Sequence, residues 1–376
     1  MATRVRFGIE EEFFLTDLET GAVVRRPSAA FHAAARDALG DFLSHELLQC
    51  QIELKTPILQ VSAEAIESLT AGRRRLFGIA SLFDMGIVAA GTHPLAQWRS
   101  QIPTSEVRYE ELLDDFQIIA QRNLLCGLHV HAEVHEGIDR IQLMNRVMRW
   151  LPLFLALSAS SPYWARQDTG LMSYRQAAYD EWPRTGIPRL FEDELEYQRY
   201  VGTLVRARAI PDESFIWWSI RPSSRYPTIE LRITDSCPRV IDAVCIAELF
   251  RVAVLQECLD ADRVDATSLR DGIERLLIEE NRWRAKRFGV RAKWLDAESG
   301  LNIDLSDCLS QLACRCANAV GELQADWAFD HARRVIAEGS SAERQRRVFS
   351  EGRAAGLTTA RALRRVVQAL VQETRG

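Results

Sequence analysis

The sequence lacks the long features that mark membrane, secreted and nucleic-acid-binding proteins. No segment offers about 18 uninterrupted apolar residues, and the first ten residues contain no apolar core of the kind that a secretory signal requires. Arg73–Arg75 is the longest basic run, and the net charge is -5. We therefore expect a cytoplasmic protein that binds neither membrane nor nucleic acid.

Other signatures are missing as well. The eight cysteines are scattered, as is typical of reduced buried thiols, and Cys314 and Cys316 alone are too few for a metal site. No phosphate loop of the form G-x-x-x-x-G-K-[ST] occurs, so any triphosphate would have to be held by metal ions and basic side chains. No repeat, low-complexity tract or linker interrupts the 376 residues, and 47% of them are hydrophobic. We expect residues 1–376 to form a single domain.

The first predicted strand, Val5 to Thr16, carries an alternating pattern. Successive side chains of a strand point to opposite faces, so Glu10 and Glu12 share one face while Glu11 lies on the other, apolar face. Two carboxylates roughly 7 Å apart repel each other unless water or a cation neutralises them. A solvated outer face is the simple alternative. Glu11 is expected to pair with a buried arginine or lysine.

Later strands carry more groups of this kind. The stretch 45–56 holds Glu46 and Glu53, whose odd spacing puts them on opposite faces unless a bulge intervenes or Glu46 lies outside the strand. The strand 126–135 has a clean apolar face, and its other face bears four polar residues, His129, His131, Glu133 and His135. Two strands near 214–221 and 227–235 follow, and the second places Glu230 and Arg232 on one face.

The remaining pattern is mainly helical. Ala22 to Arg26 is predicted to return from the first strand as a hairpin, and 86–91 reads as a short buried strand. Helices are predicted at 28–39, 62–83, 106–123, 142–160, 192–206 and 239–259, followed by helical segments separated by Asp262 and several glycines. The arginine triplet is placed on the solvated side of its helix. The C-terminal helices are assigned to packing or to a subunit contact in a homodimer.

A long ordered loop is predicted between Ser161 and Pro188, because linkers are not rich in Trp and Tyr. Its Arg166, Arg175 and Arg184 could each grip a carboxylate through the planar guanidinium, or could lie at the surface. A second basic stretch, 279–289, surrounds a Trp at a helix end and could meet phosphates or be a solvated face.

If the strands share one sheet, their polar faces form a concave bowl of carboxylates and imidazoles. Several carboxylates with one or two imidazoles suit Mg²⁺ or Mn²⁺, and these ions suit nucleotide phosphates. The sequence thus predicts a divalent-metal site for phosphate chemistry.

An ordered set of motifs resembles the glutamate-cysteine ligases, and within them the bacterial YbdK-type carboxylate-amine ligases. The motifs are G-I-E-E-E-F at 8–13, Q-I-E-L-K-T-P at 51–57, G-T-H-P at 91–94, G-L-H-V-H at 127–131, D-T-G-L-M-S-Y-R at 168–175, R-T-G-I-P at 184–188, I-E-L-R-I-T-D at 229–235 and E-E-N-R-W-R-A at 279–285. Each is weak alone, but the ordered set is specific. The resemblance implies an α+β fold, a cup-shaped and mainly antiparallel sheet flanked by helices, similar to glutamine synthetase and guanido kinases.

The resemblance also implies a reaction and roles for residues. ATP would phosphorylate the side-chain carboxylate of glutamate, and an amine, cysteine or another, would displace phosphate to form an amide. The implied Mg²⁺ ligands are Glu10, Glu12, Glu46, Glu53, His129 and Glu230. Arg232 and Arg175 would contact the transferring phosphoryl group or the substrate carboxylate, and Asn281 and Arg284 the nucleotide. Substrate-binding candidates are His131, Arg166, Arg184 and Arg221.

Two other functions stay open. A metal-dependent amide hydrolase also uses His-x-His on a strand, but such a site needs further imidazoles, and His331 is the only histidine after His135. A catalytically weak regulator that binds nucleotide or glutamate is the second alternative.

Overall fold

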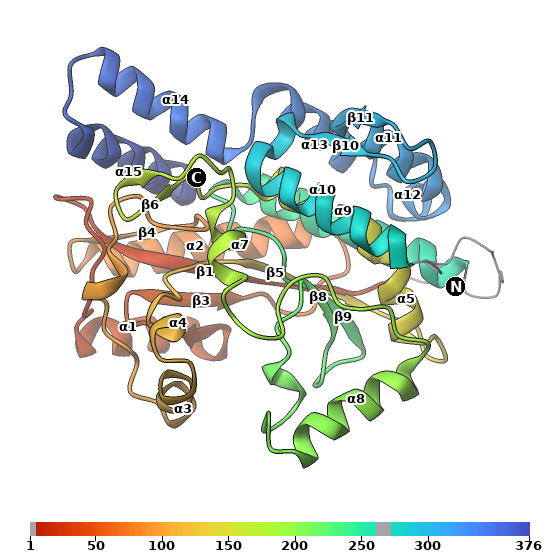
Figure 1. The fold of residues 1–376 in the computed structure, drawn as a ribbon. Coiled ribbons are helices and arrows are strands. Elements are labelled where there is room, and N and C mark those ends of the chain that lie inside the picture. The colour runs from red at the N-terminus through yellow and green to blue at the C-terminus, as the bar shows by residue number, and fades with distance from the viewer. Residues whose placement is uncertain (1–4, 261–271) are drawn as a thin grey trace.

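The computed structural model describes residues 5–260 and 272–376 (Figure 1). Its centre is a seven-stranded sheet in which every pair is antiparallel. The strand order is β2 (Leu43–His45), β3 (Gln51–Lys55), β1 (Phe7–Asp17), β5 (Leu128–Glu133), β9 (Thr228–Leu231) and β8 (Ile220–Pro222), and β4 (Met85–Val88) pairs with the far end of β1. The predicted class, a mainly antiparallel sheet flanked by helices, is confirmed.

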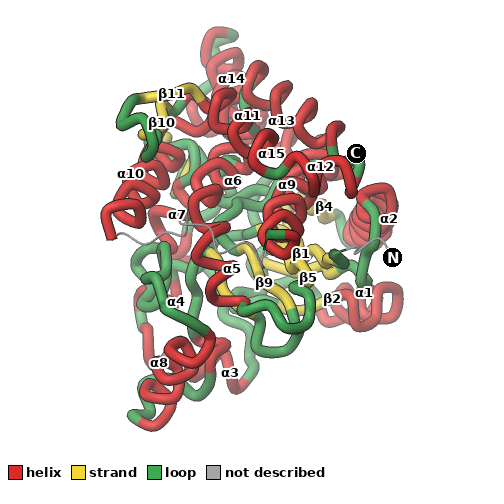
Figure 2. The backbone as a smooth tube through the Cα atoms, turned by 90° about the vertical axis from the view of Figure 1, so that its right-hand side faces the viewer, coloured by secondary structure: helices red, strands yellow, loops and turns green. Residues whose placement is uncertain are grey.

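Helices cover the apolar face of this sheet. Phe7 and Ile9 of β1 and Val130 of β5 belong to one core cluster with residues of α9. The helix α9 (Val240–Leu259) is buried along almost its whole length, so it has no solvated side (Figure 2). The helices α2 (Ser62–Ser81), α5 (Arg140–Val147) and α6 (Leu151–Ser158) pack against it, and α1 (Ala29–Leu39) packs against α2.

The C-terminal third of the chain is mainly helical. It contains α10 (Gly272–Phe288), a two-stranded sheet of β10 (Lys293–Leu295) and β11 (Asn302–Asp304), α11 (Leu305–Arg315), α12 (Ala317–Leu323), α13 (Asp326–Glu338), α14 (Ser341–Ala354) and α15 (Thr359–Arg375). Asp262, predicted to separate two helical segments, lies outside the described residues. None of the helices in the described ranges is long and apolar enough to cross a lipid bilayer.

The opposite side of the sheet faces a different set of short elements. These are α3 (Val107–Phe116), α4 (Ile118–Gln121), α7 (Tyr174–Tyr179), α8 (Glu194–Arg206) and the small sheet of β6 (Tyr163–Trp164) and β7 (Gln167–Asp168). Figure 1 shows α3 and α8 projecting away from the side on which α9 and α10 pack. The predicted loop 161–188 is ordered, because it contains β6, β7 and the short helix α7.

Several predicted elements are interrupted in the structure. The hairpin return at 22–26 is reduced to a single bridge between Thr16 and Val23. The helix predicted at 106–123 breaks at Gln117, whose φ of 48° is incompatible with a continuing helix. The helix predicted at 142–160 is split by a tight turn, Met148–Trp150, that precedes Pro152 in the first turn of α6. Local periodicity does not reveal such breaks.

The placement of the arginine triplet was wrong for one residue. Arg73 is 1% exposed, and its guanidinium meets the carboxylate of Glu11, which is 0% exposed. Arg73 Nε donates to Glu11 Oε2 at 2.9 Å, and Nη2 donates to Glu11 Oε1 and to the carbonyl of Cys237, the latter at 2.8 Å. The expected buried partner of Glu11 is therefore present, and it comes from α2.

Candidate active site

Strand register brings the predicted carboxylates and imidazoles together. Glu10 lies opposite His129, Glu12 opposite Glu53, and His131 opposite Glu230. Directly opposed side chains of antiparallel strands are about 5 Å apart, so four strands converge on one patch of the polar face. The polar faces of these strands therefore form one shared bowl, as the alternation of residues predicts.

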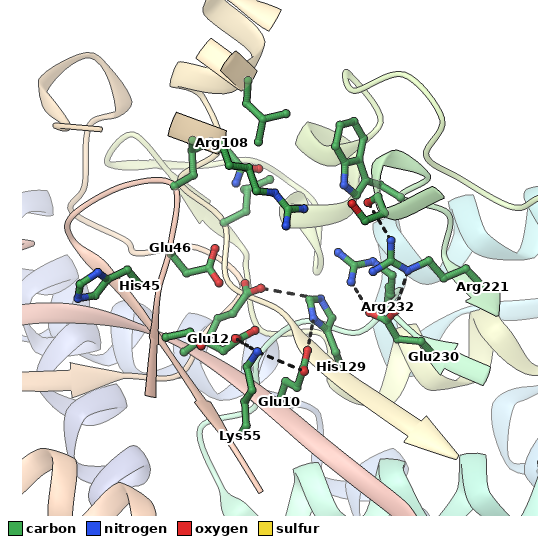
Figure 3. A pocket seen from close by; sticks show the side chains of 18 of the residues that line it. Glu10, Glu12, His45, Glu46, Lys55, Arg108, His129, Arg221, Glu230 and Arg232 are labelled. Atoms are coloured by element: carbon green, nitrogen blue, oxygen red, sulfur yellow. Dashed lines mark hydrogen bonds and ion pairs between the residues drawn. The ribbon is translucent and has the colours of Figure 1, made fainter. Parts of the chain in front are cut away.

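A cavity of about 620 Å³ lies over this face, and Figure 3 shows its labelled side chains pointing into it. The lining contains ten of the residues singled out from the sequence: Glu10, Glu12, Glu46, Glu53, His129, His131, Arg175, Arg221, Glu230 and Arg232. A cavity of this size accommodates a nucleotide-sized ligand.

Two groups of potential metal ligands share one imidazole. Glu10, His129 and Glu230 form the first group, and Glu12, Glu53 and His129 form the second; within each, the ligand atoms lie within 4.8 Å of one another. His129 Nε2 is buried and has no hydrogen-bond partner among the described residues. Carboxylate oxygens with a free imidazole nitrogen fit a divalent cation such as Mg²⁺ or Mn²⁺.

The electrostatics of the cluster agree with this fit. Burial, reinforced by the charge of Glu10, raises the pKa of Glu53 to about 8 even though Lys55 Nζ lies 3.0 Å from Glu53 Oε1. Burial and the neighbouring Arg232 lower the pKa of His129, which keeps the imidazole in the neutral form that binds metals. The acidic groups are thus crowded beyond what the nearby lysine neutralises.

Glu46 reaches the same cavity from outside the strands. The stretch 45–56 is not one strand: β2 ends at His45 and β3 begins at Gln51, so Glu46 starts the connecting loop. Thr104 fixes this loop by donating its hydroxyl to the Glu46 carbonyl at 2.6 Å. Burial and the charges of Glu12 and Glu53 raise the pKa of Glu46 well above its usual range. Glu46 and Glu53, despite their odd spacing, can both reach the cavity because Glu46 lies outside the strand.

Arginines form the other wall. Arg221 Nε donates to Glu230 Oε2 at 2.7 Å, and Arg232 Nη1 pairs with Glu230 Oε1. Burial by itself would raise the pKa of Glu230, but Arg221 and Arg232 hold it well below its usual range. Arg175 is 3% exposed, and its Nε has no partner in the described part of the chain. Glu230 therefore stands between the metal-ligand side and the cationic side.

Gly127, in the G-L-H-V-H motif, permits close approach here. A Cβ at Gly127 would lie 2.3 Å from Arg175 Nη2 and 2.9 Å from His129 Nε2. The Gly127 backbone N–H also donates to Glu12 Oε2 at 2.6 Å. The backbone at this position thus contacts both the arginine and the carboxylate, which a side chain would prevent.

Four other predicted site residues lie outside the lining of this cavity. Arg166 is exposed and donates to the carbonyl of Leu95 at 3.3 Å. Arg184 donates to the carbonyl of Phe215 at 2.9 Å and lies over the ring of Trp217. These contacts anchor the loop itself.

The two predicted nucleotide contacts also hold the chain together. Asn281 exchanges hydrogen bonds with the backbone of Leu295, both at 2.8 Å. Arg284 pairs with Glu280 and donates to the Lys293 carbonyl at 2.9 Å. In the structure, both residues join α10 to β10.

One lysine and two arginines of the lining were not singled out from the sequence. Lys55 follows Glu53 by two positions, so strand alternation would have found it. Arg108 on α3 and Arg225 in the turn before β9 also line the cavity. Among the described residues, neither arginine has a hydrogen bond to a carboxylate. Neither lies on a strand of the sheet, so strand alternation could not find them.

Solved structures share this fold. The fold is similar to that of a bifunctional glutathione synthetase from Pasteurella multocida, with a TM-score of 0.72 and 14% identity over 99% of this chain; this chain spans about half of that one, 52%. It is also similar to glutamate–cysteine ligase from Francisella tularensis in complex with AMP, with a TM-score of 0.70 and 14% identity over 99% of this chain and 89% of that one. At such identities the likeness establishes the fold alone.

Sequence comparison defines the family. The sequence model of glutamate-cysteine ligase family 2 (GCS2) matches residues 6–369, so the chain belongs to this family. A curated relative from Ectopseudomonas mendocina, named provisionally as glutamate–cysteine ligase 2, is 46% identical over 99% of this chain and 97% of its own length. One from Pseudomonas entomophila with the same provisional name is 41% identical over 99% of this chain and 97% of its own. The resemblance found in the motifs is confirmed.

Proposed function

We propose that this protein is an ATP-dependent carboxylate-amine ligase that activates the side-chain carboxylate of glutamate as an acyl phosphate. The observation that carries the proposal is the convergence of two carboxylate–imidazole groups and five arginines on one cavity. Membership of glutamate-cysteine ligase family 2 supports it. The acceptor is cysteine or another amine.

The site residues divide by charge. Glu10, Glu12, Glu53, His129 and Glu230 would hold Mg²⁺, and Glu46, which lines the same cavity, would join them. When bound, the metal neutralises the phosphate oxygens of ATP.

Arg175 and Arg232 face the same space and offer guanidinium donors to the transferring phosphoryl group or the substrate carboxylate. His131 and Arg221 line the wall beside them and would bind substrate.

The chemistry needs no nucleophile from the protein. A carboxylate oxygen of the substrate forms a bond to the γ-phosphorus of ATP as the bond to the leaving ADP oxygen breaks. The amine nitrogen then attacks the carbonyl carbon, phosphate leaves with the electron pair of the C–O bond, and the nitrogen loses a proton. The protein supplies positioning and charge neutralisation, which dominate phosphoryl transfer.

The hydrolase alternative is less well supported by the geometry. His331 Nε2 is paired with Asp242 Oδ1 at 2.8 Å between α13 and α9, and it does not line the cavity. Within the described residues, the imidazoles lining the cavity are His45, His129 and His131, and both ligand groups contain His129 alone. A carboxylate-rich set of this kind suits Mg²⁺ better than Zn²⁺.

A panel of amines tests the function. We expect phosphate release from ATP that requires Mg²⁺, L-glutamate and a suitable amine, measured across amino acids and polyamines. Silence across the whole panel would refute the ligase and leave a binding regulator. The homodimer, the cytoplasmic location and the nucleotide contacts of Asn281 and Arg284 remain predictions.

Two substitutions test the site. Glu53→Gln and Glu230→Gln should each abolish turnover while the protein still folds. Glu230→Gln should also lower the thermal midpoint of unfolding, because it leaves Arg221 and Arg232 without their shared carboxylate. Glu351→Gln on the exposed side of α14 is the matched control and should retain full activity. Wild-type rates for either site variant would contradict the shared metal bowl.

A further inference from the structure

Asp235 is a buried carboxylate that does not line the cavity. It is 0% exposed and lies four residues beyond the end of β9, in the I-T-D motif. Its Oδ2 accepts from the backbone N–H of Ser160 at 3.0 Å and from the hydroxyl of Ser161 at 2.7 Å. Its Oδ1 accepts from the hydroxyl of Ser173 at 2.8 Å. Three donors therefore converge on one carboxylate.

The two serines that donate to Asp235 connect it to Arg175. The Arg175 backbone N–H donates to Ser161 Oγ at 3.0 Å, so the hydroxyl proton of Ser161 is free to point at Asp235. Ser173 is the residue before α7, yet its side chain makes no capping bond to that helix, because its hydroxyl is engaged by Asp235. Both serines thus connect the carboxylate to the first turn of α7, where Arg175 lies.

Close packing around the Asp235 carboxylate allows it a single orientation. A Cβ at Gly91, in the G-T-H-P motif, would lie 2.6 Å from Asp235 Cγ and 2.7 Å from Oδ2. On the other side, the Asp235 backbone N–H donates to the hydroxyl of Ser158 at 3.2 Å. Because buried polar groups that are fully hydrogen-bonded hold a single geometry, Asp235 is a rigid reference point.

Arg175 itself depends on such support. Its Nη1 makes a long bond, 3.4 Å, to the carbonyl of Arg232, and its Nε has no partner among the described residues. Its guanidinium lies against Gly127 and over the ring of Tyr179, 5.5 Å from the centroid. Direct contacts of the guanidinium are therefore too few to fix it, and the backbone of α7 must do so.

We propose that Asp235 is a positioning residue that, through Ser161 and Ser173, holds Arg175 at the cavity. It joins the strand that bears Glu230 and Arg232 to the loop segment that bears Arg175, so the two arginines keep a fixed separation. The electrostatic attraction between the Asp235 carboxylate and the Arg175 guanidinium acts in the same direction. The consequence for catalysis rests on the proposed function, in which Arg175 binds an anionic group of the substrates.

Asp235→Asn keeps the shape and removes the charge. An amide has one acceptor oxygen and one NH₂ group, so it cannot accept from all three donors, and the Ser173 hydroxyl must turn round to accept from the NH₂ group. The negative charge that attracts the Arg175 guanidinium is lost as well. Ser173→Ala removes a single bond and serves where the first variant does not fold. Asp168→Asn is the matched control, since Asp168 lies in the same segment, is exposed and pairs with Arg346.

A double-mutant cycle separates positioning from general stability. Steady-state phosphate release is measured for the wild type, Asp235→Asn, Arg175→Gln and the double variant, with Mg²⁺, ATP, L-glutamate and the best amine of the panel. We expect Asp235→Asn to lower kcat/KM by about 10-fold or more, as for other residues that orient a ligand-binding group. In the Arg175→Gln background it should change kcat/KM by less than about twofold. An equal loss in both backgrounds would overturn the proposal.

A crystal structure of Asp235→Asn decides the point without any activity. The guanidinium of Arg175 should leave Gly127 while Glu53 and His129 keep their positions; an unmoved Arg175 would overturn the proposal. If the wild type itself releases no phosphate, the proposed function fails and this structural comparison still tests the role of Asp235. Asp168→Asn should match the wild type in both measurements.

Discussion

Removal of the Glu11 carboxylate charge should destabilise the protein before it affects chemistry. Glu11 and Arg73 are 0% and 1% exposed, and Glu11→Gln leaves a buried guanidinium without its counter-ion. Breaking a buried ion pair on one side costs about 3–5 kcal/mol. Arg73 retains the carbonyl of Cys237 as an acceptor at 2.8 Å, which favours the lower end of that range.

The expected shift in melting temperature follows from chain length. With an unfolding entropy of about 2.1 cal/mol/K per residue, 376 residues give roughly 0.8 kcal/mol/K, so a loss of about 3 kcal/mol lowers the midpoint by about 4 °C. Differential scanning calorimetry measures this shift, and phosphate release at 25 °C measures the chemistry. The kcat should stay within about twofold of the wild type, because Glu11 faces away from the cavity.

Two further variants make the test discriminating. Glu11→Leu combined with Arg73→Leu removes both charges and should recover part of the lost stability, because neither partner is left alone. Glu133→Gln breaks the exposed pair with Arg6 and should cost less than about 1 kcal/mol. A midpoint for Glu11→Gln equal to that of Glu133→Gln would refute the reasoning, as would a complete loss of turnover at unchanged stability.

Three other perturbations have defined outcomes. Gly127→Ala should lower kcat/KM by at least about 10-fold with a small change in melting temperature, because its Cβ displaces the Arg175 guanidinium. Burial lowers the pKa of His93 to about 3, so below about pH 6.5 the unfolded chain binds a proton that the folded chain does not. The free energy of unfolding should then fall by up to about 1.4 kcal/mol per pH unit from pH 6 to pH 4, and His93→Gln should flatten this slope in urea titrations. Without nucleotide, Mg²⁺ should raise the melting temperature of the wild type, since it neutralises the crowded carboxylates, and should raise that of Glu53→Gln less.

Each of these has a result that would count against it. Wild-type kinetics for Gly127→Ala would mean that Arg175 has room to move without consequence. A parallel pH slope in His93→Gln would assign the acid sensitivity to other groups. Equal stabilisation of the wild type and Glu53→Gln by Mg²⁺ would place the metal elsewhere; K⁺ at the same ionic strength is the control for unspecific screening.

Strand alternation carried most of the site prediction. Glu10, Glu12, Glu53, His129 and Glu230 were assigned to one face from parity, and the register of four strands places them together. The same rule assigned Glu11 to the opposite face and called for a buried cation. Such inferences hold because side chains alternate between the two faces of any extended backbone.

Residues outside the strands escaped this rule. Glu46 reaches the cavity because β2 stops one residue before it, and Arg108 reaches it from α3, which is held at that position by tertiary packing. Asn281 and Arg284 are nucleotide contacts that the motif resemblance implies, and in the structure they join α10 to β10. Whether a charged helix face meets a ligand, another element or water depends on what packs beside it.

The sequence by itself determined which side chains share a face of each strand, and its ordered motifs identified the family. Only the tertiary structure decided that Arg73 leaves the solvated face of its triplet to pair with Glu11, and that Asp235 holds the loop carrying Arg175. The physical reason is the separation along the chain of the residues that interact. Alternation is a property of neighbouring residues, whereas a buried ion pair or a shared carboxylate needs partners more than 60 positions apart, which chain folding alone brings into contact.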